Sequence, residues 1–145
     1  MLRAGLYWPE RELPSLADIA AAWCHGGDIV AIVFYRALVQ SGNTAPVDAL
    51  VGALSARRLR PLPVFVQSLK DGEAAALIAE LFASAPPAVI LNATGFSVRA
   101  GAAEDPLSKA DCPVLQIVFA GGDEPSWRAI GRGCGASRRP SVGWR

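Results

Sequence analysis

The chain alternates between unbroken apolar runs and stretches with helical periodicity, and the clearest unit lies at residues 28–66. Residues 29–35 (IVAIVFY) are apolar and β-branched throughout, which is typical of a strand covered on both faces of a parallel sheet. The next segment predicts a helix whose apolar face is formed by Val47, Leu50, Val51 and Leu54. Residues 62–66 predict a second strand. A crossover of this length requires parallel strands and a right-handed connection.

Local signals mark both ends of this central helix. Asn43 or Thr44 can cap it, and Pro46 fits its first turn, where a missing N–H is harmless. Residues 57–58 are arginines that suit the last turn, and Pro61 ends the helix. The unit is therefore predicted to be strand, helix and strand.

The same patterns continue on both sides of this unit. Further strands are predicted at residues 4–9, 88–93 and 113–119. Further helices are predicted after a Ser15 cap, over residues 73–85 with Asp71 as cap, and from residues 123–127 onward. A long loop is predicted at residues 94–111. Strands alternating with helices predict an α/β fold with a doubly wound, mainly parallel sheet of four to five strands, Rossmann-like or flavodoxin-like.

Composition adds one unusual feature. With glycine counted and tyrosine left out, apolar residues make up about 60% of the 145 residues, against 45–50% in typical soluble domains, so some surface is expected to be covered. The net charge of +1 gives no electrostatic reason to bind nucleic acid or an acidic membrane. Neither a membrane-spanning run nor a signal-peptide core is found, so we expect a cytoplasmic protein. The three cysteines are far apart, which argues against a disulfide framework and a zinc site.

Polar residues that follow the predicted strands are the candidates for binding. They are Tyr35, Arg36, Ser41, Asn43, Thr44, Asn92 and Thr94. In a doubly wound sheet the carboxyl ends of the strands hold the ligand, so Arg36 and Asn92 could bind a carboxylate, an amide or a facing domain. Structural roles compete with this interpretation, because an Asn at a strand end often bonds its own backbone and an Arg often pairs with a carboxylate.

Sites for nucleotides, metals or catalysis are not indicated. The turn at residues 41–44 precedes a helix but lacks both glycine-rich phosphate-binding patterns. His25 is the single histidine, next to Cys24, and is better explained as a loop residue than as a metal ligand. The sequence brings together no nucleophile, base and orienting group. From the residues alone, the chain reads as a binding or interface domain.

Six blocks of sequence, in order over about residues 3–127, resemble the family of aerobic cobaltochelatase large subunits (CobN type), which also includes the magnesium chelatase H subunits. The matching blocks are residues 4–9 (AGLYWP), 34–48 (FYRALVQSGNTAPVD), 61–71 (PLPVFV and SLKD), 89–94 (VILNAT), 105–107 (DPL) and 113–116 (PVLQ). The block at residues 34–48 is the most specific, and its sequence is closer to the cobalt branch than to the magnesium branch.

The resemblance implies a part in ATP-dependent insertion of cobalt into hydrogenobyrinic acid a,c-diamide, a corrin, during cobalamin biosynthesis. It implies a large subunit that holds the tetrapyrrole and the metal, and separate AAA+ partner subunits that use the ATP. Such subunits are many times longer than this chain. We therefore expect a fragment that binds no cofactor and is inactive on its own, with cobalt and ATP used by the intact complex. The alternatives are a free-standing, non-catalytic Rossmann-like interaction domain and a segment of a magnesium chelatase H subunit.

The expected organisation has three parts: a lead-in strand and helix at residues 1–27, a Rossmann-like domain at residues 28–129, and a disordered tail at residues 130–145. The tail has no helical or strand period, and its Arg, Gly, Ser, Cys and Trp content suits a frameshifted reading after Trp127. A natural basic tail or a cloning artefact are the competing explanations. A segment of a larger subunit exposes faces that its neighbours cover, so we expect self-association.

Overall fold

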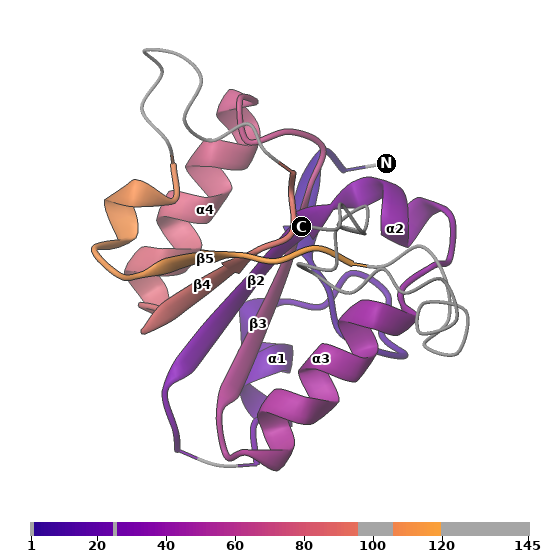
Figure 1. Cartoon of the computed structure of the whole chain (residues 1–145), viewed down its shortest axis with the longest axis vertical. Helices are drawn as coiled ribbons and strands as arrows, with labels where there is room; N and C mark the ends of the chain where they lie inside the picture. Colours follow the sequence, from indigo (N-terminus) through magenta and orange to yellow (C-terminus); the bar gives the residue numbers. More distant parts are fainter. Residues whose placement is uncertain (1, 25, 96–105, 120–145) are drawn as a thin grey trace, which may run out of the picture.

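A five-stranded sheet organises the computed structural model, which describes residues 2–24, 26–95 and 106–119 (Figure 1). The strands are β1 (Ala4–Leu6), β2 (Ile29–Tyr35), β3 (Arg60–Val66), β4 (Val89–Asn92) and β5 (Val114–Gln116). Their order in the sheet is β1-β3-β2-β4-β5. Four strands run parallel, and β1 alone pairs antiparallel, with β3. The predicted mainly parallel, doubly wound α/β fold is thereby confirmed.

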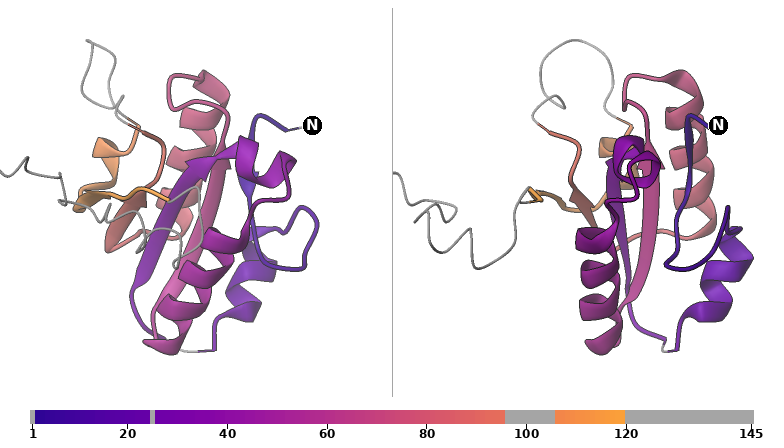
Figure 2. Two further views of the ribbon diagram at one scale, coloured as in Figure 1. Left: turned by 45° about the vertical axis from the view of Figure 1, so that its right-hand side comes forward. Right: turned by 90° about the vertical axis from the view of Figure 1, so that its right-hand side faces the viewer.

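Helices lie on both faces of this sheet (Figure 2). They are α1 (Leu16–Ala22), α2 (Arg36–Gln40), α3 (Ala45–Ala56), α4 (Gly72–Ser84) and the short 3-10 helix η2 (Ser108–Ala110). Figure 2 shows α3 on one side of the sheet and α1 and α4 on the other. None of the helices in the described part of the chain is long and apolar enough to cross a membrane.

Two cores result, because side chains of a strand point alternately to its two faces. Ala31 and Val33 of β2 belong to the core under α1 and α4, together with Ile78. Ile32 and Phe34 of β2 belong to the second core, under α3. All four side chains are fully buried. Burial on both faces explains why β2 reads as an unbroken apolar run.

Prolines limit how far β1 can pair with β3. The N–H of Arg60 donates to the carbonyl oxygen of Asp28, so even-numbered residues of β3 donate toward β2 and odd-numbered ones face β1. Pro61 and Pro63 stand at those odd positions and have no N–H to donate. Beyond Leu6, which lies opposite Val64, the Tyr7 N–H still donates to the carbonyl oxygen of Pro63 (3.0 Å), but Pro63 has no N–H to donate back.

Two of the expected caps form as predicted, and one does not. Ser15 and Asp18 make a reciprocal capping box on α1, and the Asp71 carboxylate accepts a hydrogen bond from the backbone N–H of Glu73 at the start of α4 (2.9 Å). Thr44 occupies the capping position of α3, but its side chain does not cap the helix. Its hydroxyl donates instead to Asp48, at 3.2 Å.

Some predicted boundaries were wrong. The sequence patterns missed α2, which begins directly after β2, so Arg36 starts a helix rather than ending a strand. β3 begins two residues earlier than predicted, and α3 ends at Ala56, before the two arginines. β4 and β5 are shorter than predicted.

The lead-in segment joins the same sheet through β1 and places Ile19 in the core. The predicted helix at residues 123–127 and the tail at 130–145 lie outside the described residues, as does His25.

Candidate functional site

The carboxyl ends of β2 and β4 meet where the sheet reverses its order of connection. From β2 the chain crosses to β3 on one side, and from β3 it returns past β2 to β4 on the other side. This is the topological switch point, the usual place for a ligand in an open α/β sheet. Tyr35 ends β2 and Asn92 ends β4, so two predicted residues lie at this point.

Hydrogen bonds join three of the predicted residues there. The Tyr35 hydroxyl donates to the carbonyl oxygen of Thr94 (3.2 Å). The Asn92 Oδ1 accepts from the Thr94 N–H (3.0 Å) and from the Thr94 hydroxyl (2.6 Å), while its Nδ2 donates to Oε1 of Gln116 (3.2 Å). Asn92 thus forms a turn by bonding the nearby backbone, which is the structural role predicted for an Asn at the end of a strand.

Exposure separates the roles of these groups. Asn92 is 1% exposed and Thr94 is 2% exposed, whereas Tyr35 is 40% exposed and Gln116 lies at the surface. Asn92 and Thr94 therefore hold the loop after β4 in place. The side chains available for contact with a ligand or a neighbouring domain are those of Tyr35 and Gln116.

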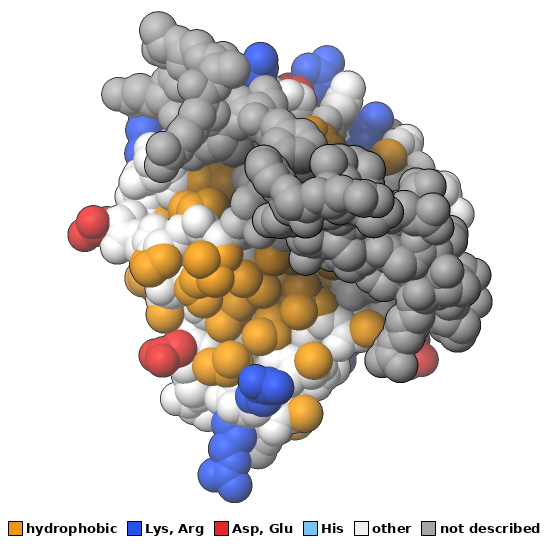
Figure 3. Space-filling view, in the orientation of Figure 1, with side chains coloured by type: hydrophobic (Ala, Val, Ile, Leu, Met, Phe, Trp, Pro, Cys, Tyr) orange, Lys and Arg blue, Asp and Glu red, His pale blue; other side chains and the backbone are white. Residues whose placement is uncertain are grey.

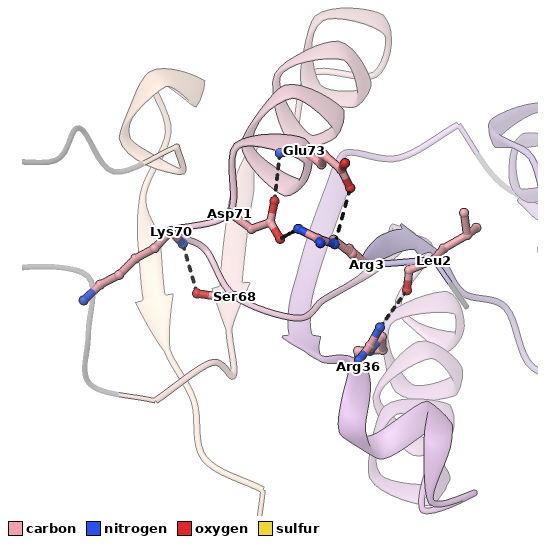
Figure 4. A network of polar contacts seen from close by, with 7 residues as sticks. All are labelled: Leu2, Arg3, Arg36, Ser68, Lys70, Asp71 and Glu73. Carbon is pink, nitrogen blue, oxygen red and sulfur yellow. Dashed lines mark hydrogen bonds and ion pairs between the residues drawn. The ribbon is translucent and has the colours of Figure 1, made fainter.

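Arg36 is directed toward the amino-terminal segment. Its guanidinium donates to the carbonyl oxygen of Leu2 at 3.2 Å (Figure 4). The adjacent Arg3 lies 3.4 Å from the Asp71 carboxylate and 3.8 Å from that of Glu73. Figure 4 shows these contacts tying the amino-terminal segment to the starts of α2 and α4. Arg36 therefore has a backbone carbonyl as its partner, which neither interpretation of the sequence expected.

The turn at residues 41–44 belongs to a separate cluster. The Ser41 hydroxyl and the Asn43 N–H both donate to the carbonyl oxygen of Leu38, at 3.3 and 3.0 Å. The Thr44 hydroxyl donates to Asp48. These bonds hold the turn against the end of α2. The structure thus brings Tyr35, Asn92 and Thr94 together, and the three turn residues form a second group.

Tyr7, which directly follows β1, also belongs to this second cluster. Its hydroxyl donates to Oδ1 of Asp48 at 2.6 Å, and its ring meets Phe34 edge to face, with centroids 5.8 Å apart. Burial, and then the bond to the Asp48 carboxylate, raise the pKa of Tyr7 above 10.0. The phenol therefore stays protonated and acts as a donor throughout the physiological range.

An apolar pocket of about 280 Å³ opens beside this tyrosine. It is lined by Leu2, Leu6, Tyr7, Arg11, Glu12, Leu13, Pro14, Val39 and Phe65. The backbone φ of Leu13 is +46°, and its side chain is 71% exposed at the pocket. The lining provides van der Waals contacts for an apolar group, with one cation and one anion.

Local sequence patterns did not identify Tyr7, Asp48 and Gln116 as members of these clusters. Tyr7 and Asp48 are 41 residues apart, and Asn92 and Gln116 are 24 apart. Predicting such pairs requires the register of the strands in the sheet, and a local sequence pattern does not contain it. Within residues 2–24, 26–95 and 106–119, no three His, Cys, Asp or Glu side chains gather closely enough to hold a metal ion.

Comparison with known proteins gives the family. The profile described as CobN/Magnesium Chelatase matches residues 1–139, which extends beyond residue 130, where the resemblance was expected to end. The aerobic cobaltochelatase subunit CobN of Sinorhizobium sp is 42% identical over 144 residues, and that of Pseudomonas aeruginosa is 32% identical over 134. Each alignment covers 92% of this chain and 11% of the relative.

A solved structure supports the fold. The catalytic subunit of cobaltochelatase from Mycobacterium tuberculosis superposes with a TM-score of 0.60 at 24% identity, over 89% of this chain and 11% of that one. The chain therefore spans about a ninth of the length of the relatives it matches. A profile match over nearly the whole chain, together with the Sinorhizobium identity, shows that it belongs to the CobN/magnesium chelatase family.

Proposed function

We propose that this chain is a segment of the large subunit of an ATP-dependent cobaltochelatase. The intact enzyme would insert cobalt into the corrin hydrogenobyrinic acid a,c-diamide in the cytoplasm, during cobalamin biosynthesis, with AAA+ subunits as the partners that use ATP. The observation that carries this proposal is the identity of 42% to a CobN subunit. Cobalt is a substrate in this scheme, and the segment by itself is expected to be inactive.

The cobalt branch is favoured over magnesium insertion by the relatives themselves. Both curated proteins that match are cobaltochelatase subunits, although the family profile covers both metals. The free-standing interaction domain remains the second candidate, because the predicted site residues are joined by hydrogen bonds of a structural kind.

Within the proposed subunit, the switch point would face the substrate or a neighbouring domain. Tyr35 offers an exposed ring whose hydroxyl is held by Thr94, and Gln116 offers an amide at the surface. An aromatic face and amide groups suit an extended macrocycle that carries amide and carboxylate side chains. Arg36, Ser41, Asn43 and Thr44 would then shape the neighbouring surface rather than bind the corrin.

A chimera tests the proposal. This chain would replace the matching segment of the Sinorhizobium CobN subunit, and ATP-dependent cobalt insertion would be measured with the partner subunits of that enzyme. We expect the chimera to retain activity. A chimera that folds and assembles like the parent, as judged by circular dichroism and light scattering, but inserts no cobalt would refute the function.

The same chimera tests the role of the switch point. Tyr35→Ala removes the exposed ring and should raise the KM for the corrin by about tenfold, the equivalent of one aromatic contact. Glu80→Ala, at an exposed position on α4, is the matched control and should leave the KM unchanged. An unchanged KM for Tyr35→Ala, at equal stability, would remove Tyr35 from the site.

A further inference from the structure

Within residues 2–24, 26–95 and 106–119, no helix covers β4 and β5 on the side of the sheet that carries α3. The parallel register aligns Ile32 of β2 with Leu91 of β4, and Leu91 with Leu115 of β5. Residues aligned in this way point to the same face, so Leu91 and Leu115 continue the row that begins at the buried Ile32. Ala93 and Phe119 pack against the same core. We call Val89, Leu91, Ala93, Leu115 and Phe119 the open sheet face.

This face is apolar and partly exposed. Leu115 is 53% exposed, and the other four residues are of intermediate exposure. Figure 3 shows a continuous group of hydrophobic side chains beside α3, where Figure 1 has β2, β4 and β5 with no helix in front of them. Strands of a parallel sheet are normally covered on both faces. Such a patch therefore marks an interaction surface.

The connections of the described chain explain why the face is open. The crossover from β2 to β3 places α3 over those two strands. The crossover from β3 to β4 places α4 on the opposite face. The connection from β4 to β5 carries η2 and the fully buried Leu107, which also belongs to the core under α4. Right-handed crossovers thus bring α4 and η2 to the same side of the sheet.

The dimensions of the open sheet face suit one helix. Neighbouring strands lie about 4.8 Å apart, so β4 and β5 together present a strip about 10 Å wide. An α-helix with its side chains is about 10–12 Å in diameter. One helix, lying alongside α3, would therefore cover the strip.

We propose that the open sheet face is the docking site of one amphipathic helix, supplied by the rest of the longer chelatase subunit. This inference rests on the proposed function. The relatives contain about nine times the length of this chain, so most of the polypeptide able to cover the face lies outside the matched segment. The row from Leu91 to Leu115 carries no charge, and the occupant must present leucine-like side chains at helical spacing.

Cysteine labelling tests the docking. Leu115→Cys would be made in this chain and at the aligned position of the intact Sinorhizobium subunit, and maleimide labelling would be located by peptide mass spectrometry. In this chain we expect Cys at position 115 to react as fast as the exposed control Glu80→Cys. In the intact subunit it should react roughly 100-fold more slowly, at the rate of local opening. Val47→Cys, on the buried face of α3, should be protected in both proteins.

Equal labelling of position 115 in the intact subunit and in this chain would overturn the proposal. If Cys at position 115 of this chain were protected from maleimide at every protein concentration, the proposal would also be overturned, because residues 120–145 would then be the occupant. Protection that increases with protein concentration would identify a second copy instead. A photoreactive maleimide on the intact subunit should capture peptides with contacts spaced by three or four residues, and capture of an extended segment would refute the helix.

The labelling needs neither cobalt nor ATP. Failure of the chimera to insert cobalt would therefore refute the proposed function without changing the labelling ratio. If the chimera inserts cobalt but position 115 is labelled equally fast in this chain and in the intact subunit, the docking alone would be refuted.

Discussion

Replacing Tyr7 with phenylalanine removes one hydroxyl that links the end of β1 to the first turn of α3. The hydroxyl donates to Oδ1 of Asp48 at 2.6 Å, and this is the contact that the variant loses. The ring keeps its edge-to-face contact with Phe34, so packing is conserved. The variant therefore isolates a hydrogen bond between a phenol and a carboxylate.

The expected cost follows from the charge of the acceptor. A hydrogen bond to a charged group contributes about 1.5–3 kcal/mol. The lower end applies here, because the pair is only partly buried and the Thr44 hydroxyl still donates to the other oxygen of Asp48 at 3.2 Å. We expect Tyr7→Phe to lower the free energy of unfolding by about 1.5 kcal/mol. Tyr35→Phe is the matched control, since its acceptor is the neutral carbonyl of Thr94, and should cost about 0.5 kcal/mol.

The difference between wild type and Tyr7→Phe should depend on pH. Burial and Asp48 raise the pKa of Tyr7 in the folded state above its unfolded value of 10.0. The protonated phenol is thus favoured by folding, so its contribution is fully present below pH 10 and is lost as pH rises through the folded pKa. Urea unfolding, followed by far-ultraviolet circular dichroism at pH 7 and at increasing pH above 10, would measure this. A cost equal to that of Tyr35→Phe, or one that grows above pH 10, would refute the reasoning.

Two further substitutions test the switch point and the turn before β2. Asn92→Leu leaves the buried N–H and hydroxyl of Thr94 without their acceptor and should cost about 3 kcal/mol in urea unfolding, and a cost below about 1 kcal/mol would show that the Asn92 turn is dispensable. Gly27→Ala would place a Cβ in steric conflict with the carbonyl oxygen of Arg58 and should cost about 2 kcal/mol or more. Gly52→Ala, in α3 with open space around it, is its control and should raise the free energy of unfolding by about 0.5–1 kcal/mol, measured in the same way. Similar effects of the two glycine substitutions would contradict the steric argument.

Local signals allowed much of the fold to be predicted. Residues 29–34 are buried on both faces of the sheet, so the apolar run that they form with Tyr35 predicted the observed bounds of β2. Ser15 and Asp71 cap through bonds to residues two or three positions away, which lie within the reach of a sequence motif. By contrast, α2 has five residues, no side-chain cap and no buried position, so neither propensity nor periodicity marks it.

Only the part of the candidate site that follows from the order of the strands in the sheet could be predicted. Tyr35, Asn92 and Thr94 come together because parallel strands end at one edge, and that edge follows from the order of strands and helices. The partner of Arg36 could not be predicted, because Leu2 reaches it only through the antiparallel pairing of β1.

The open sheet face and the switch point are two consequences of the same connections, and β5 belongs to both. Leu115 is exposed on one side of β5, and the next residue, Gln116, accepts the hydrogen bond from the Asn92 side chain on the other. β5 has three residues, all exposed, so it depends on β4 for its position. A helix packed on Leu115 would hold β5 in place and thereby strengthen the bond that orients Asn92 and Thr94. We therefore expect docking on the open face and order at the switch point to be coupled: in the intact subunit, Leu115→Glu should raise the KM for the corrin although position 115 does not face the switch point.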